Sequence, residues 1–263
     1  MPMAGREGTG LAGYARCFKG IVCREALRFW HQRERFISAL VRPLVWLFIF
    51  AAGFRSVLGV SIIPPYETYV LYEVYITPGL MAMIALFSGM QSSLSMVYDR
   101  EMGNMRTLLI SPFPRWFLLT SKLAAGTAVS LAQIYAFLLI AYFWEIEPPS
   151  LWGYLTVLPA LILAGLMFGA LGMLLSSLIK QLENFAGIMN FVIFPMFFAS
   201  SALYPLWRVK ESSPWLATLC EFNPFTHAVE LIRFAFYERI NFLALGAVLG
   251  AATIFLAAAI LAY

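Results

Sequence analysis

Few residues in this sequence could carry chemistry. Its only histidines are His31 and His227, and its only cysteines are Cys17, Cys23 and Cys220. Neither histidine has a cysteine or carboxylate partner at the spacing of metal ligands, so we expect no metal site. Three widely separated cysteines do not make a disulfide framework. These residues therefore predict neither metal chemistry nor a disulfide-stabilised fold.

A nucleotide site is also not predicted. The stretch Gly8-Thr9-Gly10-Leu11-Ala12-Gly13 matches G-x-G-x-x-G, but no strand precedes it, as a dinucleotide-binding unit requires. The sequence contains no G-x-x-x-x-G-K-[ST] loop to hold nucleotide phosphates. If ATP drives this protein, the nucleotide must bind to another subunit.

The composition is that of a membrane protein. Of the 263 residues, 61% are hydrophobic and 12% are charged. A soluble domain usually carries roughly twice that charged fraction, which it needs for a polar surface. The net charge of +4 does not predict nucleic-acid binding, because the basic residues flank apolar segments and do not interleave with aromatic ones. Lipid is therefore the expected partner of much of the surface.

Six apolar stretches are long enough to cross a bilayer core of about 30 Å, which takes roughly 20 helical residues. We predict an all-α membrane protein with spans at Ile37–Leu58, Ile76–Val97, Phe117–Trp144, Tyr154–Leu178, Phe185–Leu203 and Phe242–Tyr263. Three cations, Arg42, Arg55 and Lys122, fall near span ends, where long side chains can reach the headgroups. The chain is interpreted as two parts: residues 1–36, a cytoplasmic N-terminus, and residues 37–263, one transmembrane domain.

Lys and Arg residues predict the orientation. Seven precede the first span, and Arg100, Arg106, Arg115 and Lys180 fall on the same side if there are six spans. The loops after the first and third spans contain glutamates and no Lys or Arg. Both termini are therefore expected in the cytoplasm. Residues 1–13 are small and polar, so no cleavable signal peptide is expected.

The segment Tyr14–Phe36 is predicted to be an amphipathic helix and not a span. Its apolar residues recur at helical spacing, and basic residues fill much of the remaining surface. Such a helix would lie in the cytoplasmic headgroup plane, held by apolar burial and by anionic lipid.

Two segments outside the spans have unusual patterns. Directly after the second span comes a charged run, Asp99–Arg106, then a short apolar stretch that ends at Pro112 and Pro114. This pattern fits a short helix that docks into a partner's groove, or equally an ordinary charged membrane border. After the fifth span, prolines break the chain before Asn223-Pro224-Phe225-Thr226, which should cap and begin a short apolar helix. Glu230 and Arg233 on that helix are placed to pair.

The same two segments resemble the permease family of ABC-2 type exporters. The family pattern after the second span, R-E-x-G-x-x-x-x-L-L-x-[ST]-P, is matched by Arg100-Glu101, Gly103, Leu108-Leu109 and Ser111-Pro112. The signature after the fifth span is matched by Pro205-Leu206, Trp215-Leu216, Asn223-Pro224-Phe225-Thr226, Val229-Glu230 and Ile232-Arg233. Pro214 directly precedes Trp215, where the family often has a residue between them. The resemblance covers nearly the whole chain.

The resemblance implies a mechanism and partners. Two copies of the chain would enclose a path, and a separate ATP-binding subunit would hold ATP and Mg²⁺. No cofactor is expected on this chain, and it is not expected to be an enzyme. Coupling to the ATPase would fall to Asp99, Arg100, Glu101, Gly103, Asn104, Arg106, Leu108, Leu109 and Pro112. A re-entrant helical hairpin capping the external exit would involve Pro205, Trp215, Asn223, Pro224, Thr226, Glu230 and Arg233.

Polar residues inside the spans leave two interpretations open. Ser88, Gln91, Ser92, Ser95 and Gln133 could line the path, or could make hydrogen bonds between helices. An ion-coupled secondary transporter is the alternative function, although it usually needs ionisable groups at the membrane midplane, and most spans have none. A membrane enzyme would need a cluster around His227, whose nearest acid is Glu230. A non-transporting structural subunit is the third alternative.

Overall fold

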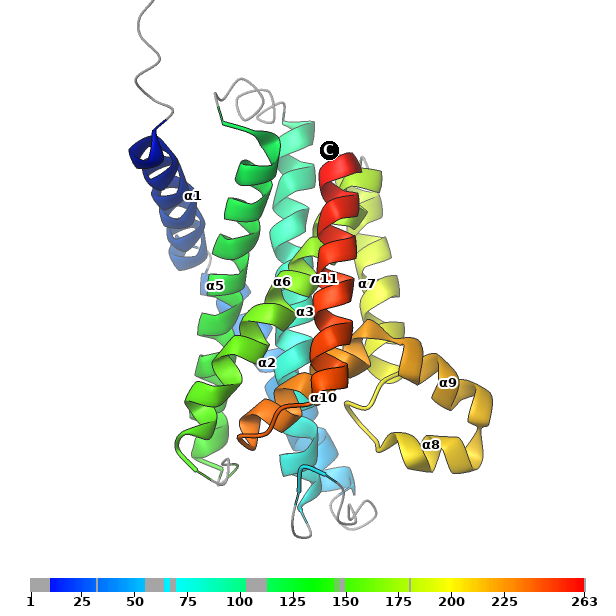
Figure 1. The fold of residues 1–263 in the computed structure, drawn as a ribbon. Coiled ribbons are helices and arrows are strands. Elements are labelled where there is room, and N and C mark those ends of the chain that lie inside the picture. The colour runs from blue at the N-terminus through cyan, green and yellow to red at the C-terminus, as the bar shows by residue number, and fades with distance from the viewer. Residues whose placement is uncertain are drawn as a thin grey trace, which may run out of the picture.

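The described part of the chain is entirely helical. The computed structural model describes residues 10–31, 33–54, 64–66, 70–102, 113–144, 146, 150–179 and 181–262. Within them Figure 1 shows a bundle of long helices with shorter helices at one end. The helices are α1 (Leu11–His31), α2 (Arg33–Phe54), α3 (Tyr72–Glu101), α5 (Arg115–Tyr142), α6 (Gly153–Leu178), α7 (Leu182–Phe198), α8 (Leu206–Ser212), α9 (Pro214–Phe222), α10 (Pro224–Phe236) and α11 (Phe242–Ala262). The predicted all-α class is confirmed for these residues.

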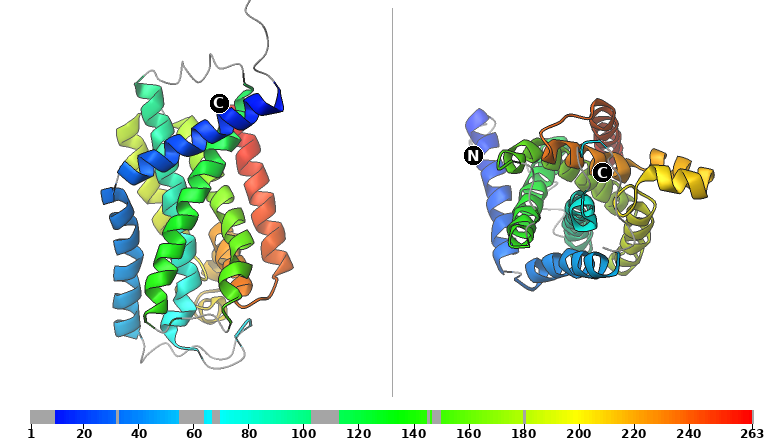
Figure 2. Two further views of the ribbon diagram at one scale, coloured as in Figure 1. Left: turned by 90° about the vertical axis from the view of Figure 1, so that its left-hand side faces the viewer. Right: turned by 90° about the horizontal axis from the view of Figure 1, so that it is seen from below.

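Helix α3 is the centre of the bundle. It contacts α2, α5, α6, α7 and α10, which surround it when the molecule is seen end-on (Figure 2). Every residue from Tyr75 to Met90 is buried. The neighbouring helices therefore cover the middle of α3 on all sides.

Four helices are long and apolar enough to cross a membrane: α3, α5, α6 and α11. The predicted boundaries of the last two are close, since α6 begins one residue before Tyr154 and α11 begins at the predicted Phe242. The other apolar helices in the described part, α7 and the Leu40–Ile49 stretch of α2, are shorter. At 17 residues, α7 is about 25 Å long, less than a core of about 30 Å. Four membrane-length helices are therefore confirmed, and six spans stay a prediction.

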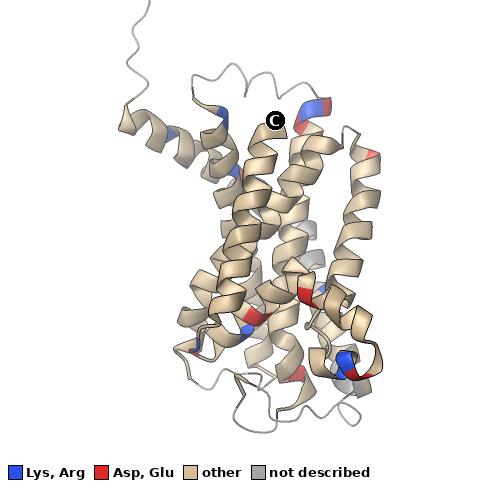
Figure 3. Ribbon diagram, turned by 45° about the vertical axis from the view of Figure 1, so that its right-hand side comes forward, with Lys and Arg blue, Asp and Glu red and all other residues tan. Residues whose placement is uncertain are grey.

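The bundle has two distinct ends (Figure 1). At one, which we call the Glu101 end, α3, α6 and α11 finish and α5 and α7 begin. At the other, the Tyr72 end, α3, α6 and α11 begin, α5 finishes, and α8 and α9 project sideways from the bundle. Most of the charged residues that Figure 3 colours lie towards these two ends, as a bilayer favours. Arg42 of α2 was expected near a span end, but its guanidinium lies 4.0 Å from the ring centroid of Phe87, in the middle of α3.

Helices α3 and α6 pack with their backbones in contact. A Cβ atom added at Gly89 of α3 would lie 2.8 Å from the backbone nitrogen of Gly169 on α6. Small residues permit this close approach, which is a common way of packing helices where lipid removes the hydrophobic driving force.

Helix α1 lies across the outside of the bundle at the Glu101 end, against α5 (Figure 2). Its Tyr14 ring packs edge-on against Phe113 and Phe117, with centroids 5.0 and 4.8 Å apart. The helix begins at Leu11 and ends at His31, where the sequence predicted Tyr14–Phe36. Its oblique course differs from that of the bundle helices (Figure 2).

Candidate functional site

Asn223 joins two helix ends at the Tyr72 end of the bundle. Its Nδ2 donates hydrogen bonds to the Met196 carbonyl at 2.7 Å and the Ala199 carbonyl at 2.6 Å, where α7 finishes. Its Oδ1 accepts from the Phe225 amide at 2.9 Å, which caps the start of α10 as the sequence predicted. The last carbonyl groups and the first N–H groups of a helix have no partner within the helix. The Asn223 amide therefore satisfies carbonyl groups at the end of α7 and an N–H group at the start of α10. Pro224 takes the first position of α10, where a missing N–H does no harm.

Arg233 fixes α10 against the rest of the bundle. It is 3% exposed, and its Nη1 donates to Glu230, the pair that the sequence predicted. Its Nη2 donates to the Ser201 carbonyl at 2.9 Å, and the guanidinium lies 4.2 Å from the ring centroid of Tyr75 on α3. A buried cation is tolerated only with such compensation. These contacts tie α10, α3 and the turn after α7 into one cluster.

Two tyrosines in the first turn of α3 complete the cluster. The Tyr72 hydroxyl donates to the Leu203 carbonyl at 2.7 Å, and the Tyr75 hydroxyl donates to the Ser201 carbonyl at 3.0 Å. Tyr66 packs edge-on against Tyr237 with ring centroids 4.9 Å apart. Burial raises the pKa of the Tyr66 phenol to about 12, so it stays neutral at physiological pH. The sequence analysis did not predict these tyrosines as site residues. Tyr72 and Tyr75, three residues apart at the start of an apolar helix, could have indicated a polar contact there.

The predicted external residues divide into two groups. Asn223, Pro224, Thr226, Glu230 and Arg233 follow one another along α10, where Thr226 is buried. Trp215 lies on α9, which projects from the bundle, and its side chain is 72% exposed (Figure 1). Pro205 is buried directly before α8. The structure therefore joins the α10 residues in one site and leaves Trp215 outside it.

At the Glu101 end, the last turns of α3 contact two other helices. Asp99 is 5% exposed, and its Oδ2 accepts a hydrogen bond from Lys122 Nζ of α5 at 3.2 Å. Glu101 Oε1 accepts from the backbone N–H of Leu182 at 2.9 Å, so a carboxylate caps the start of α7. A negative charge is favourable at this position because the start of a helix carries a partial positive charge. Arg100 lies in the same last turn.

Lys122 corrects one sequence-based expectation. Near the end of a span it was expected to extend towards the headgroups, but its side chain is 7% exposed and turned inward to Asp99. The ion pair shields both charges from the apolar surroundings, which is why the side chain points into the protein. Six of the predicted coupling residues fall outside the part of the chain that the structure describes: Gly103, Asn104, Arg106, Leu108, Leu109 and Pro112.

The predicted path residues lie on α3 and α5. Ser88 and Gln133 are buried, and Gln91, Ser92 and Ser95 are half-buried. The Ser95 hydroxyl donates to the Ser92 carbonyl of its own helix at 2.6 Å. Ser92 also lines a small cavity between α3, α5 and α6, beside Lys122. Within the described chain, the buried Gln133 Oε1 has no hydrogen-bond partner.

The fold and these sites define a class of protein. A helical bundle with four membrane-length apolar helices and most of its charges towards the two ends is a multi-pass membrane protein. In the described residues no group of three or more His, Cys, Asp or Glu side chains could hold a metal ion.

Comparison with known proteins identifies the family. Residues 16–237 match the ABC-2 type transporter family. A relative named as transport permease ycf38 in Cyanophora paradoxa is 27% identical over 204 residues, which cover 76% of this chain and 67% of the relative. A relative named as multidrug ABC transporter permease YbhR in Escherichia coli is 28% identical over 164 residues, 62% of this chain and 43% of the relative. Nodulation protein J of Rhizobium leguminosarum is 25% identical over 200 residues, 75% of this chain and 73% of that protein.

The chain therefore belongs to the ABC-2 type transporter family, and it is a transport permease. The match includes both segments that carry the sequence resemblance, and the resemblance is confirmed.

Proposed function

We propose that this chain is the membrane subunit of an ATP-binding-cassette exporter. Two copies would enclose the substrate path, and a separate subunit would bind ATP and Mg²⁺ and hydrolyse the ATP. The observation that carries the proposal is the family match over residues 16–237, joined to the polar contacts at the Glu101 end of α3. A permease without a nucleotide site of its own needs such a contact region for its ATPase.

The coupling region would be Asp99–Pro112, immediately after α3. Asp99 and Glu101 support this role because they link the end of α3 to α5 and α7 through hydrogen bonds of 3.2 and 2.9 Å. A push on the following segment would therefore reach three helices at once. Arg100 and the rest of this segment would contact the ATPase directly.

The topology that we propose has six spans, with α2 and α7 added to the four membrane-length helices. The Glu101 end would face the cytoplasm of a bacterial cell, because most of the flanking Lys and Arg residues belong to that side. Both termini would then be cytoplasmic. Helix α1 would lie in the cytoplasmic headgroup plane, which its oblique course outside the bundle supports (Figure 2).

The segment from Pro205 to Arg233 would form a re-entrant hairpin at the outer face. Non-helical backbone at membrane depth needs polar partners inside the protein. The Asn223 and Arg233 contacts supply partners for the carbonyls of Met196, Ala199 and Ser201 where α7 stops short. This hairpin would cap the external exit, and the half-buried Ser92 and its neighbours on α3 would line part of the path.

The test is affinity purification of the tagged chain in mild detergent, followed by subunit identification and an ATPase assay. We expect a soluble ATP-binding subunit to co-purify and to hydrolyse ATP in a vanadate-sensitive manner. A preparation that contains no ATPase, together with no gene for one beside this gene, would contradict the proposal. It would favour an ion-coupled transporter or a structural membrane subunit.

A further inference from the structure

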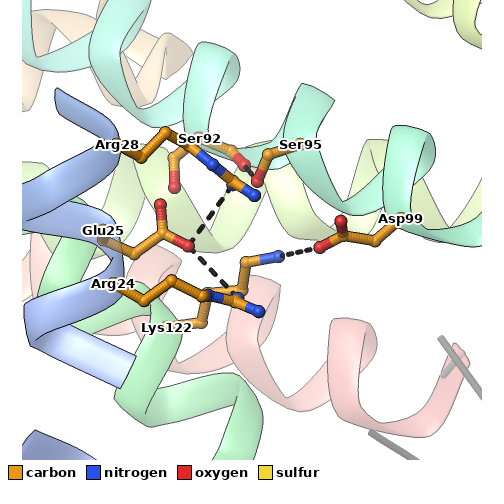
Figure 4. A network of polar contacts seen from close by, with 7 residues as sticks. All are labelled: Arg24, Glu25, Arg28, Ser92, Ser95, Asp99 and Lys122. Carbon is orange, nitrogen blue, oxygen red and sulfur yellow. Dashed lines mark hydrogen bonds and ion pairs between the residues drawn. The ribbon is translucent and has the colours of Figure 1, made fainter. Parts of the chain in front are cut away.

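Lys122 lies where three helices meet at the Glu101 end. From α5 it donates to Asp99 of α3 at 3.2 Å, and both side chains are 7% exposed. From the other side, α1 presents Glu25, which is 8% exposed and contributes with Asp99 to the electrostatic field at Lys122. Figure 4 shows this arrangement, with Glu25 and Asp99 on opposite sides of the lysine.

Glu25 is held in place from its own helix. Its Oε1 accepts hydrogen bonds from Arg24 Nη2 at 3.3 Å and Arg28 Nη1 at 3.5 Å (Figure 4). The cluster therefore contains three cations and two carboxylates, contributed by α1, α3 and α5. Lys122 is the only one of the three cations that belongs to the bundle itself, and it is the most deeply buried of them. Its ion pair is with Asp99, whereas Glu25 forms its ion pairs with Arg24 and Arg28 of its own helix.

A buried ion pair is a poor source of stability. The desolvation of two charges largely offsets their attraction, so apolar side chains of similar volume often stabilise a protein as well or better. Where such pairs have a clear benefit, it is that they favour one arrangement of the parts over others. Here the parts are the last turns of α3, the first turns of α5 and the middle of α1.

We propose that Lys122 is a positioning residue for the coupling of ATP hydrolysis to movement of the permease. As the counter-ion of Asp99, it holds α5 and the end of α3 together as one unit, and α1 packs against α5 with Glu25 on the Lys122 side. A displacement of the segment after Glu101 is then carried to α5 and α1 and is not absorbed by bending of α3 alone. This inference rests on the exporter function proposed above.

The surroundings of Lys122 allow a conservative test variant. The cavity beside it is lined by small side chains, among them Ser92, Ser93 and Gly126. An arginine at position 122 keeps the positive charge. Lys122→Met removes the positive charge and leaves the Asp99 carboxylate without its partner. The double variant Asp99→Asn/Lys122→Met removes both charges, so no buried charge is left unpaired.

The experiment uses the complex of the full chain with its ATPase subunit in lipid nanodiscs. Spin labels are attached at Leu155→Cys of α6 and Leu219→Cys of α9, both exposed at the Tyr72 end. Cys17 and Cys23 are replaced by serine, and the buried Cys220 is retained. The distance between labels is measured with and without ATP and vanadate, and the ATPase rate is measured on the same samples. Lys210→Met, an exposed lysine of α8, is the matched control.

We expect ATP and vanadate to shift the label distance in the unsubstituted complex, in Lys122→Arg and in Lys210→Met. Lys122→Met should lose the shift and keep most of its ATPase rate. The decisive variant is Asp99→Asn/Lys122→Met, which should fold and hydrolyse ATP but also lose the shift. Glu25→Gln should reduce the shift less than Lys122→Met, because it leaves the ion pair between Lys122 and Asp99 intact.

A double variant with a normal shift would overturn the positioning role, because the lysine would then only neutralise a buried aspartate. A normal shift in Lys122→Met would do the same. An unsubstituted complex that hydrolyses ATP without any shift would overturn the exporter mechanism itself, and the role of Lys122 with it. The two failures are distinguishable because the second appears without any substitution in the cluster.

Discussion

Replacement of Arg233 by methionine tests the cluster that holds α10 in place. The substitution keeps a long side chain but removes the guanidinium, its hydrogen bond to the Ser201 carbonyl, and the partner of Glu230. Removal of one member of a buried ion pair typically costs about 3–5 kcal/mol, because the other charge is left without a partner. Arg233 is 4% exposed and Glu230 is 22% exposed, so water can partly solvate the remaining carboxylate.

We therefore expect the lower part of that range for the pair, about 3 kcal/mol. The lost hydrogen bond to the Ser201 carbonyl contributes about 1 kcal/mol more. Because these contacts share one side chain, they are not fully additive. The expected loss in the free energy of unfolding is about 3–4 kcal/mol.

The measurement is reversible unfolding of the purified chain in mixed micelles with rising sodium dodecyl sulfate. The matched control is Arg16→Met, an exposed arginine on α1, which should change the free energy of unfolding by less than about 0.5 kcal/mol. The double variant Glu230→Gln/Arg233→Met should recover part of the lost free energy of unfolding, because it leaves no buried charge without a partner. If Arg233→Met were no more destabilising than Arg16→Met, the cluster would not hold α10 and the reasoning would be refuted.

Four further predictions concern other positions. Asn223→Ala removes the donor of the bonds to Met196 and Ala199 and the cap of α10, and should lower the free energy of unfolding by about 1–2 kcal/mol in the same titration. Gly89→Ala should lower it by about 1–3 kcal/mol, because the new Cβ atom would overlap the backbone of α6. Gly246→Ala, with open space around it, should be neutral or stabilising by up to about 1 kcal/mol. Glu101→Gln should keep ATPase binding and hydrolysis but weaken the ATP-dependent label shift; an unchanged shift would contradict the coupling role.

The long apolar helices could be predicted from sequence because composition alone determines them. For α6 and α11, unbroken apolar runs bounded by polar residues predicted the first residue of each helix to within one position. Helix α7 was predicted to continue to Leu203 but ends at Phe198. Its last carbonyls are bound by Asn223, which lies more than twenty residues further along the chain. Local sequence carries no signal for such a distant partner.

The polar clusters could be predicted only where their members are close in sequence. Glu230 and Arg233 are three residues apart on one helix, and their pairing was predicted and is confirmed. Lys122 and Asp99 are 23 residues apart on different helices, and their pairing was missed. The usual tendency of a lysine near a span end to extend outward led to the opposite expectation. What decides its direction is a buried carboxylate on a neighbouring helix, which only the packing of α3 against α5 reveals.

Helix α3 connects the two candidate sites. Its first turns contact the Ser201–Leu203 turn through Tyr72 and Tyr75, and its last turns hold Lys122 and the start of α7 through Asp99 and Glu101. The helix is 30 residues long, about 45 Å, and is buried along most of its middle. Close-packed surroundings resist bending and transmit displacement. With its last turns held to α5 by Lys122, α3 should therefore carry an axial movement at Glu101 to Tyr75 and Arg233 with little loss, whereas a helix exposed to lipid on one side could bend and absorb it. This argument makes α3 the element on which both ends of the permease depend.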